Sequence, residues 1–257
     1  MTAPAVPRRR SLVLPVILVI GVLGALVWLG TWQIERKAWK EALIANLESR
    51  LSAPPAHLPP RERWKQLDAA TDEFTRVSFQ ATFVPGAQAL VYSSGSNLRP
   101  DVTGPGYWVF SPARLSGGSL VVVNRGFVPE GRQDATTRAE GEPEGVVDIV
   151  GVMRWPEPRG TFTPNDEPQK SLWFVRDPAA MAAAKSWGTI APFYIDQEAP
   201  QAEGGLPRVG PLKVNLPNNH LQYAVTWYGL AAVLLVASLV FLRSWRREAP
   251  AAADPRG

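Results

Sequence analysis

Two long uncharged stretches, one near each end of the chain, dominate the hydrophobic pattern of this 257-residue sequence. Residues 11–30 contain no charged side chain, and neither do residues 221–242. At a rise of ~1.5 Å per residue, a helix of about 20 residues crosses the ~30 Å hydrocarbon core of a bilayer. We therefore expect two transmembrane helices, over residues 11–32 and 218–242.

The first stretch has a cleaved signal peptide as its main alternative interpretation. The apolar region of a signal peptide is usually ~7–15 residues long and ends at a small-residue cleavage site. Here the run is longer and leads into Trp28 and Trp32, so we expect an uncleaved anchor. Residues 33–50 lack Gly and Pro and repeat apolar side chains at helical spacing. This pattern predicts an amphipathic helical extension of the first span.

Between the two spans the pattern changes to a period of two. Val77, Phe79, Ala81 and Phe83 alternate with polar residues, which predicts a half-buried strand. Further strands are expected at residues 89–92, 107–110, 120–123, 146–153, 193–196 and 212–215. A short helix is expected over residues 178–187, capped by Asp177. We therefore expect an α+β membrane protein in which residues 51–217 form a β-rich, mainly antiparallel domain.

Charge adds an orientation to this picture. Basic clusters border both spans, at Arg8, Arg9, Arg10, Arg243, Arg246 and Arg247. The positive-inside rule then places both tails, residues 1–10 and 243–257, in the cytoplasm. The domain would lie in the periplasm of a bacterium, anchored in the inner membrane. The formal net charge of +4 comes from these tails, so we do not expect a nucleic-acid partner; the expected partner surface is the lipid bilayer.

The residue inventory argues against common enzyme sites. There is no cysteine, and the two histidines are His57 and His220. Zinc and di-iron centres therefore lack ligands. The chain has neither a phosphate-binding glycine loop nor a Gly-x-Ser-x-Gly motif. The acidic run at residues 140–144 reads as a solvated loop. We expect no catalytic residue.

Three segments stand out: LGTWQIERKAWK at residues 29–40, VVVNRGFVP at residues 121–129, and NNHLQYAVTWYGLA at residues 218–231. In this order, and with a large domain between two spans, they resemble the Surfeit locus protein family of cytochrome c oxidase assembly factors. One small departure is Phe127, where the family more often has Trp.

The resemblance implies a protein that binds haem a and helps to insert it into cytochrome c oxidase subunit I, together with the haem a synthesis machinery. His220 looks like the axial ligand of the haem iron. The other residues expected at the cofactor are Trp32, Arg36, Tyr223, Trp227 and Arg125. A hairpin-like pairing of the spans would bring those of the two spans to one depth. Haem needs an imidazole, apolar walls and cations near its propionates, and Arg36 and Arg125 could supply the cations.

Other interpretations stay open. From the residues alone, His220 is an interfacial histidine near a helix start, where Asn218 and Asn219 are candidate caps. Arg125 could equally form a structural ion pair or a turn contact. The protein could also be a scaffold that stabilises an unassembled oxidase subunit without binding haem, or a membrane-anchored enzyme. The carrier and the scaffold differ in whether His220 contacts iron.

Overall fold

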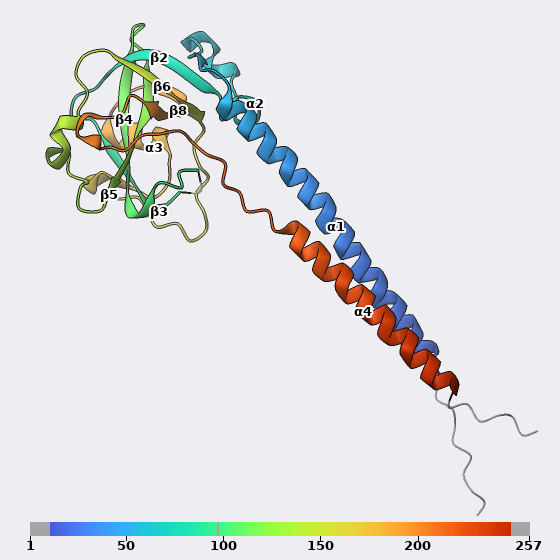
Figure 1. Ribbon diagram of the computed structural model, residues 1–257. Helices are drawn as coiled ribbons and strands as arrows, with labels where there is room; N and C mark the ends of the chain where they lie inside the picture. Colours follow the sequence, from blue (N-terminus) through green and yellow to red (C-terminus); the bar gives the residue numbers. More distant parts are fainter. Residues whose placement is uncertain (1–10, 97, 248–257) are drawn as a thin grey trace, which may run out of the picture. The chain divides into compact units, whose positions relative to one another are not determined.

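The computed structural model describes residues 11–96 and 98–247, and the chain divides into two compact units (Figure 1). A helix pair comprises Met1–Leu43 and Pro217–Gly257, and a sheet domain comprises Ile44–Leu216. The arginines at positions 8–10, for which a cytoplasmic location is expected, and the last part of the C-terminal tail lie outside the described residues.

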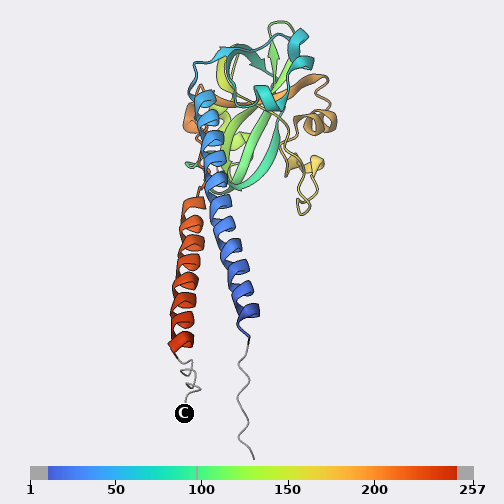
Figure 2. The same cartoon turned by 90° about the vertical axis from the view of Figure 1, so that its right-hand side faces the viewer.

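The helix pair is built from α4 (His220–Arg247) and the part of α1 (Val13–Ser52) up to Leu43, which lie side by side (Figures 1 and 2). Both helices are long and apolar enough to cross a membrane, judged by length and composition. The carbonyl oxygen of Asn219 accepts a hydrogen bond from the Tyr223 amide (3.3 Å). The side-chain oxygen of Asn218 has no partner within the described part of the chain, so the cap expected from this residue is not formed.

The sheet domain contains eight strands within the described residues, in the order β1-β2-β6-β8-β5-β4-β3-β7. Their bounds are β1 (Ala56–His57), β2 (Arg76–Phe83), β3 (Ala89–Gly95), β4 (Thr103–Leu115), β5 (Leu120–Pro129), β6 (Val147–Arg154), β7 (Leu172–Trp173) and β8 (Ile190–Ala199). An additional pairing joins β2 to β4. Strands β2, β6, β8, β5 and β4 therefore close into a small barrel, which leaves no free edge among them.

The sheet is mixed, which corrects the expectation of a mainly antiparallel domain. The buried neighbours β5 and β8 run parallel, and so do the pairs β1–β2 and β3–β7. Strand β8 follows β5 only after β6 and the helix α3 (Pro178–Lys185). Connections of that length permit a parallel return, whereas the sequence pattern of a strand does not specify its partner.

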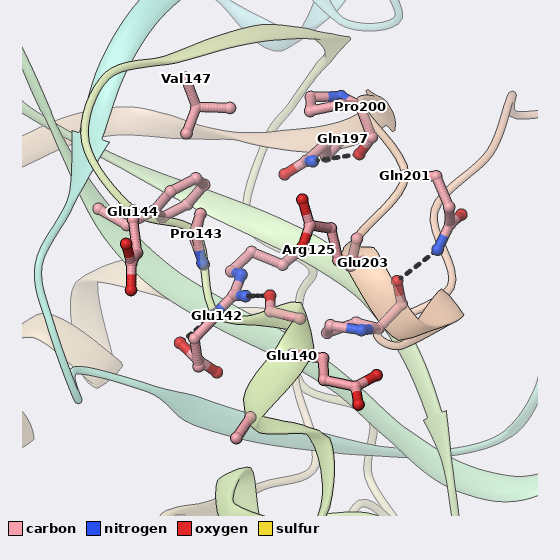
Figure 3. A pocket seen from close by; sticks show the side chains of 15 residues that line it. Arg125, Glu140, Glu142, Pro143, Glu144, Val147, Gln197, Pro200, Gln201 and Glu203 are labelled. Carbon is pink, nitrogen blue, oxygen red and sulfur yellow. Dashed lines mark hydrogen bonds and ion pairs between the residues drawn. The ribbon is translucent and has the colours of Figure 1, made fainter.

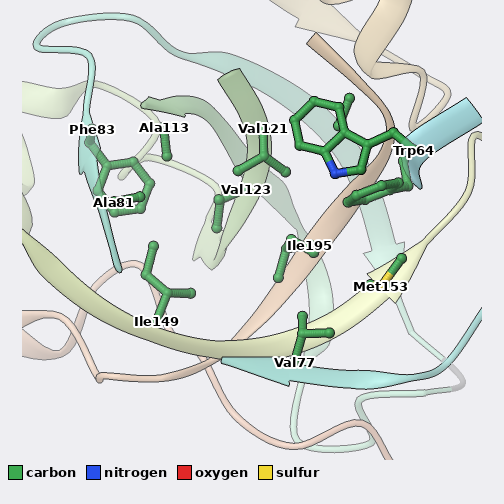
Figure 4. Packing of buried hydrophobic residues seen from close by; sticks show 12 residues of the cluster. Trp64, Val77, Ala81, Phe83, Ala113, Val121, Val123, Ile149, Met153 and Ile195 are labelled. Carbon is green, nitrogen blue, oxygen red and sulfur yellow. The ribbon is translucent and has the colours of Figure 1, made fainter. Parts of the chain in front are cut away.

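Successive side chains along β5 and β8 point to opposite faces, and the domain therefore has two hydrophobic cores. Val121 and Val123 of β5 point into the barrel, where Ile195 of β8 joins them (Figure 4). Phe193 of β8 belongs to the same core. Trp64, from the 3-10 helix η1 (Arg61–Gln66), packs edge-on against Phe193 at 5.7 Å between ring centroids. The barrel interior is therefore filled by side chains, and Trp64 covers the end where β8 begins.

The opposite faces of the same strands form the second core. Val122 and Tyr194 pack there with Trp173 of β7 and Met181 of α3. The predicted strand at residues 77–83 and the predicted helix with its Asp177 cap are confirmed, since Asp177 accepts from the amides of Ala179 and Ala180. The short strand expected at residues 212–215 is not formed.

Candidate functional site

His220 is hydrogen bonded to a side chain of the other long helix. Its Nδ1 lies 2.7 Å from Oε1 of Gln33 on α1. An amide oxygen only accepts hydrogen bonds, so in the neutral tautomer that donates to Gln33, Nδ1 carries the proton and Nε2 keeps its lone pair. Metal-binding histidines are commonly oriented in this way, through a hydrogen bond from the ring nitrogen that does not bind the metal. The first and third sequence segments thus meet at His220.

Further contacts join the two helical segments on either side of His220 and Gln33. Tyr228 Oη lies 3.1 Å from Thr31 Oγ1. A Cβ atom on Gly30 would lie 2.8 Å from the Tyr228 ring, so the glycine makes room for that ring. Lys40 Nζ donates to the carbonyl oxygen of Pro217 next to the start of α4. Along the helix pair, His220 therefore lies between the contact of Tyr228 with Thr31 and the contact of Lys40 with Pro217.

The remaining site residues of the helix pair occupy different faces. Gly30 and Gln33 mark the side of α1 that meets α4, and at ~100° per residue Trp32 lies about 160° around the helix from Gly30. Trp32 is 45% exposed. Arg36 is exposed and stacks on Trp39, with its guanidinium carbon 3.9 Å from the ring centroid.

The two aromatic candidates of α4 also differ from each other. Trp227 follows His220 by seven residues, or two helical turns, which places it on nearly the same face. Trp227 is half-buried, whereas Tyr223 is 56% exposed. Helical position therefore groups Trp227 with His220 and Gln33, and it separates Trp32 from them.

Arg125 belongs to the sheet domain, where its guanidinium has partners. It is 5% exposed and donates to Glu142 Oε2 (2.9 Å) and to the Gly141 carbonyl oxygen (2.5 Å). Burial lowers the pKa of Arg125, while the charge of Glu142 opposes this shift. The ion pair that the sequence left open for Arg125 is therefore present.

The neighbours of Arg125 in the second segment are also bound within the domain. Asn124 Nδ2 donates to Asp196 Oδ1 (2.6 Å), and Asn124 Oδ1 accepts from the Gly126 amide (3.2 Å). Gly126 has a φ of +116°, and a Cβ there would lie 2.4 Å from the Arg208 carbonyl oxygen. The strand register shifts at this point, so the segment forms a bulge that requires glycine.

Comparison with known proteins identifies the family. The family model described as "SURF1 family" matches residues 20–232. A SURF1-like protein of Monosiga brevicollis is 38% identical, over 84% of this chain and 82% of its own length. Surfeit locus protein 1 is 36% identical in Rattus norvegicus and 34% in Homo sapiens, over 86% of this chain in each case and 72% and 74% of their lengths. The chain belongs to the SURF1 family.

Sequence reasoning missed several residues that this SURF1 family member brings into contact with the expected ones. Gln33 was inside the first segment, but its role depends on how the two helices pair. Glu142 was assigned to a solvated acidic loop, yet it binds Arg125. Asp196 had no visible signal, because its partners Asn124 and Arg154 are distant in sequence.

Proposed function

We propose that this SURF1 family member is a cytochrome c oxidase assembly factor that binds haem a at His220 and passes it to oxidase subunit I. Family membership supports the assembly role, through the resemblance of the three segments. The observation that carries the haem proposal is the hydrogen bond between His220 and Gln33, because it presents a lone pair on Nε2.

We further propose that α1 and α4 span a bacterial inner membrane. Their length and composition support this, and Arg243, Arg246 and Arg247 near the end of α4 favour a cytoplasmic C-terminus. The helix boundary that begins with His220 would then lie on the periplasmic side, together with the sheet domain. The haem would be taken up where the membrane meets water.

The residues around His220 suit a flat apolar cofactor with anionic edges. Nε2 of His220 would bind the iron, and the aromatic rings of Trp227 and Tyr223 would offer apolar surface. Arg36 is an exposed cation, and it would serve the propionates. Trp32, on another face of α1, would contact the haem only at its edge or lie in the lipid interface. Arg125 keeps its ion pair with Glu142 and is left out of the proposed haem site.

The carrier role also requires that haem leave again. A haem held through one histidine is released more readily than one held through two. Gln33 would keep the imidazole in the ligating tautomer during loading, so that uptake needs no rotation of the ring. This chain would therefore act by binding and releasing its cargo, without a chemical step of its own.

The proposal is tested in cells that lack this gene and express variants of it. His220→Ala is expected to leave the oxidase short of haem a, although the variant protein accumulates in membranes as the parent does. His57→Ala is the matched control, since it removes the other histidine, and it is expected to restore haem a fully. If His220→Ala also restored the haem a content, the carrier role would be wrong. A scaffold that stabilises an oxidase subunit without binding haem would then explain the family's part in assembly.

A further inference from the structure

The barrel has a cavity at the end opposite Trp64. Its volume is about 550 Å³, within the usual range for ligand sites, and barrel mouths are common places for them. Strands β5, β6 and β8 contribute Arg125, Val147 and Gln197 to its walls (Figure 3). Strand β2 contributes Phe83. The segments at residues 139–144 and 200–207 supply the rest of the lining. We call this cavity the barrel mouth.

The barrel mouth carries unbalanced negative charge. Its lining includes the carboxylates of Glu140, Glu142, Glu144 and Glu203 and a single cation, Arg125. Arg125 is already paired with Glu142. Within the described residues, the other three carboxylates have no ion-pair partner, and all three residues are exposed. A cation that enters the mouth would meet this field.

Gln197 gives an independent indication of a missing donor. It is 9% exposed, and its Nε2 donates to the Pro200 carbonyl oxygen at 2.9 Å. Its Oε1 is buried and has no hydrogen-bond partner in the described part of the chain. Gln197 follows Phe193 and Ile195 on the inward face of β8, so its side chain belongs to the wall of the mouth. Buried acceptors are nearly always satisfied, which makes this oxygen a candidate for a ligand N–H.

The remaining lining includes apolar side chains beside the polar Gln201. The apolar residues are Phe83, Pro143, Val147, Pro200 and Pro207. Such walls suit a methylene chain better than a small hydrated ion. Lysine and arginine side chains combine an apolar stem with a charged group that only donates hydrogen bonds. The three observations therefore favour the same chemical group.

We propose that the barrel mouth receives a lysine or arginine side chain of a partner polypeptide. The stem packs against Phe83 and the prolines, and the charged head lies beside Glu203, while Glu140 and Glu144 at the edges of the mouth add to the negative field (Figure 3). One of its N–H groups moves in to donate to Gln197 Oε1. This site is separate from His220, and it holds whether or not the protein binds haem.

The test uses the full-length protein in detergent and N-acetyl-arginine methylamide as the probe. Saturation-transfer NMR at low salt is expected to detect saturable binding that weakens as salt is added. N-acetyl-citrulline methylamide has nearly the same shape without the charge, and it is expected not to bind. Equal binding of the two probes, or no binding of the arginine probe, would overturn the proposal.

Variants locate the binding. The triple substitution Glu140→Gln, Glu144→Gln and Glu203→Gln is expected to lower the affinity for the arginine probe by about fivefold or more, because charge-assisted bonds are lost. Glu48→Gln, Glu62→Gln and Glu130→Gln together make the same change in net charge at exposed positions outside the mouth, and should leave binding unchanged. Gln197→Met should also weaken binding of the arginine probe, while the thermal unfolding midpoint of the variant stays close to that of the parent. Equal loss in the mouth and control triples, or no loss in the mouth triple, would contradict this location.

Discussion

The second sequence segment, in the sheet domain, and the third, in the helix pair, differ in how their polar side chains are bonded. In the domain, Asn124 and Arg125 have their hydrogen-bonding groups engaged by Asp196, Glu142 and the backbone. In the helix pair, the bond from His220 to Gln33 uses one ring nitrogen and not the other. A prominent segment whose polar groups are all engaged stabilises the fold, whereas one that keeps a group available can serve a ligand.

The two units also differ in how they bury apolar surface. The domain has two cores, one inside the barrel and one under α3. In the helix pair, the buried residues within the described ranges are small: Gly30, Ala224 and Ala231. Stability to unfolding in water should therefore be decided by the domain, and haem loading by the pair. Substitutions in the two units should separate these properties.

The largest effect is expected from Asp196→Ala in the domain. The substitution removes one of the two carboxylate partners of the buried Arg154 guanidinium (3.2 Å), leaving Glu73, and it also removes the acceptor of Asn124 Nδ2. Removing one member of a buried ion pair typically costs about 3–5 kcal/mol of unfolding free energy. Urea unfolding followed by circular dichroism would measure it. Asp148→Ala, at an exposed residue bonded to Gln80, should cost less than about 1 kcal/mol. Similar costs for both would break the assignment of Asp196 to the fold.

A smaller effect is expected from Gly30→Leu in the helix pair. A side chain there would displace the Tyr228 ring and separate α1 from α4. Because the chain has no cysteine, Gln33→Cys with His220→Cys gives a clean background for a short thiol cross-linker, and it keeps the Tyr228 ring in place. The cross-linking yield should fall several-fold in Gly30→Leu, while domain stability changes by less than about 0.5 kcal/mol. Gly24→Leu, on the same helix with no atom near its Cβ position, should leave the yield unchanged.

The smallest effect concerns acid. The side chain of Arg99 donates hydrogen bonds to the Asp101 carboxylate. These bonds, and the positive charge of Arg99, lower the pKa of that carboxyl from its usual value. A carboxylate with a lowered pKa stabilises the fold above its unfolded pKa of about 3.9, and this contribution is lost as the pH falls through the folded value. Asp101 is largely exposed, so the contribution should be below about 1 kcal/mol. In Asp101→Asn, the unfolding free energy of the domain should fall less steeply below pH ~4 than in the parent. The same pH dependence in both proteins would show that the Arg99–Asp101 pair contributes nothing.

Much of the fold and part of the site follow from local sequence pattern. Period two gave the strand over residues 77–83, and an aspartate followed by proline gave the start of α3. The parallel pairing of β5 with β8 was out of reach, because strand partners are set by packing between distant segments. For the same reason His220 could be proposed from its segment, whereas Gln33 became visible only once α1 and α4 were paired.

The central claim is that His220 binds the iron of haem a. Its most direct test is the visible absorption spectrum of the detergent-purified protein, co-expressed with a haem a synthesis pathway, beside His220→Ala, Gln33→Ala and His57→Ala. All variants must first match the parent in yield and secondary structure. We expect a Soret band in the parent and in His57→Ala, its loss in His220→Ala, and a shifted or weakened band in Gln33→Ala. An unchanged band in His220→Ala, or no haem in the parent, would contradict the claim.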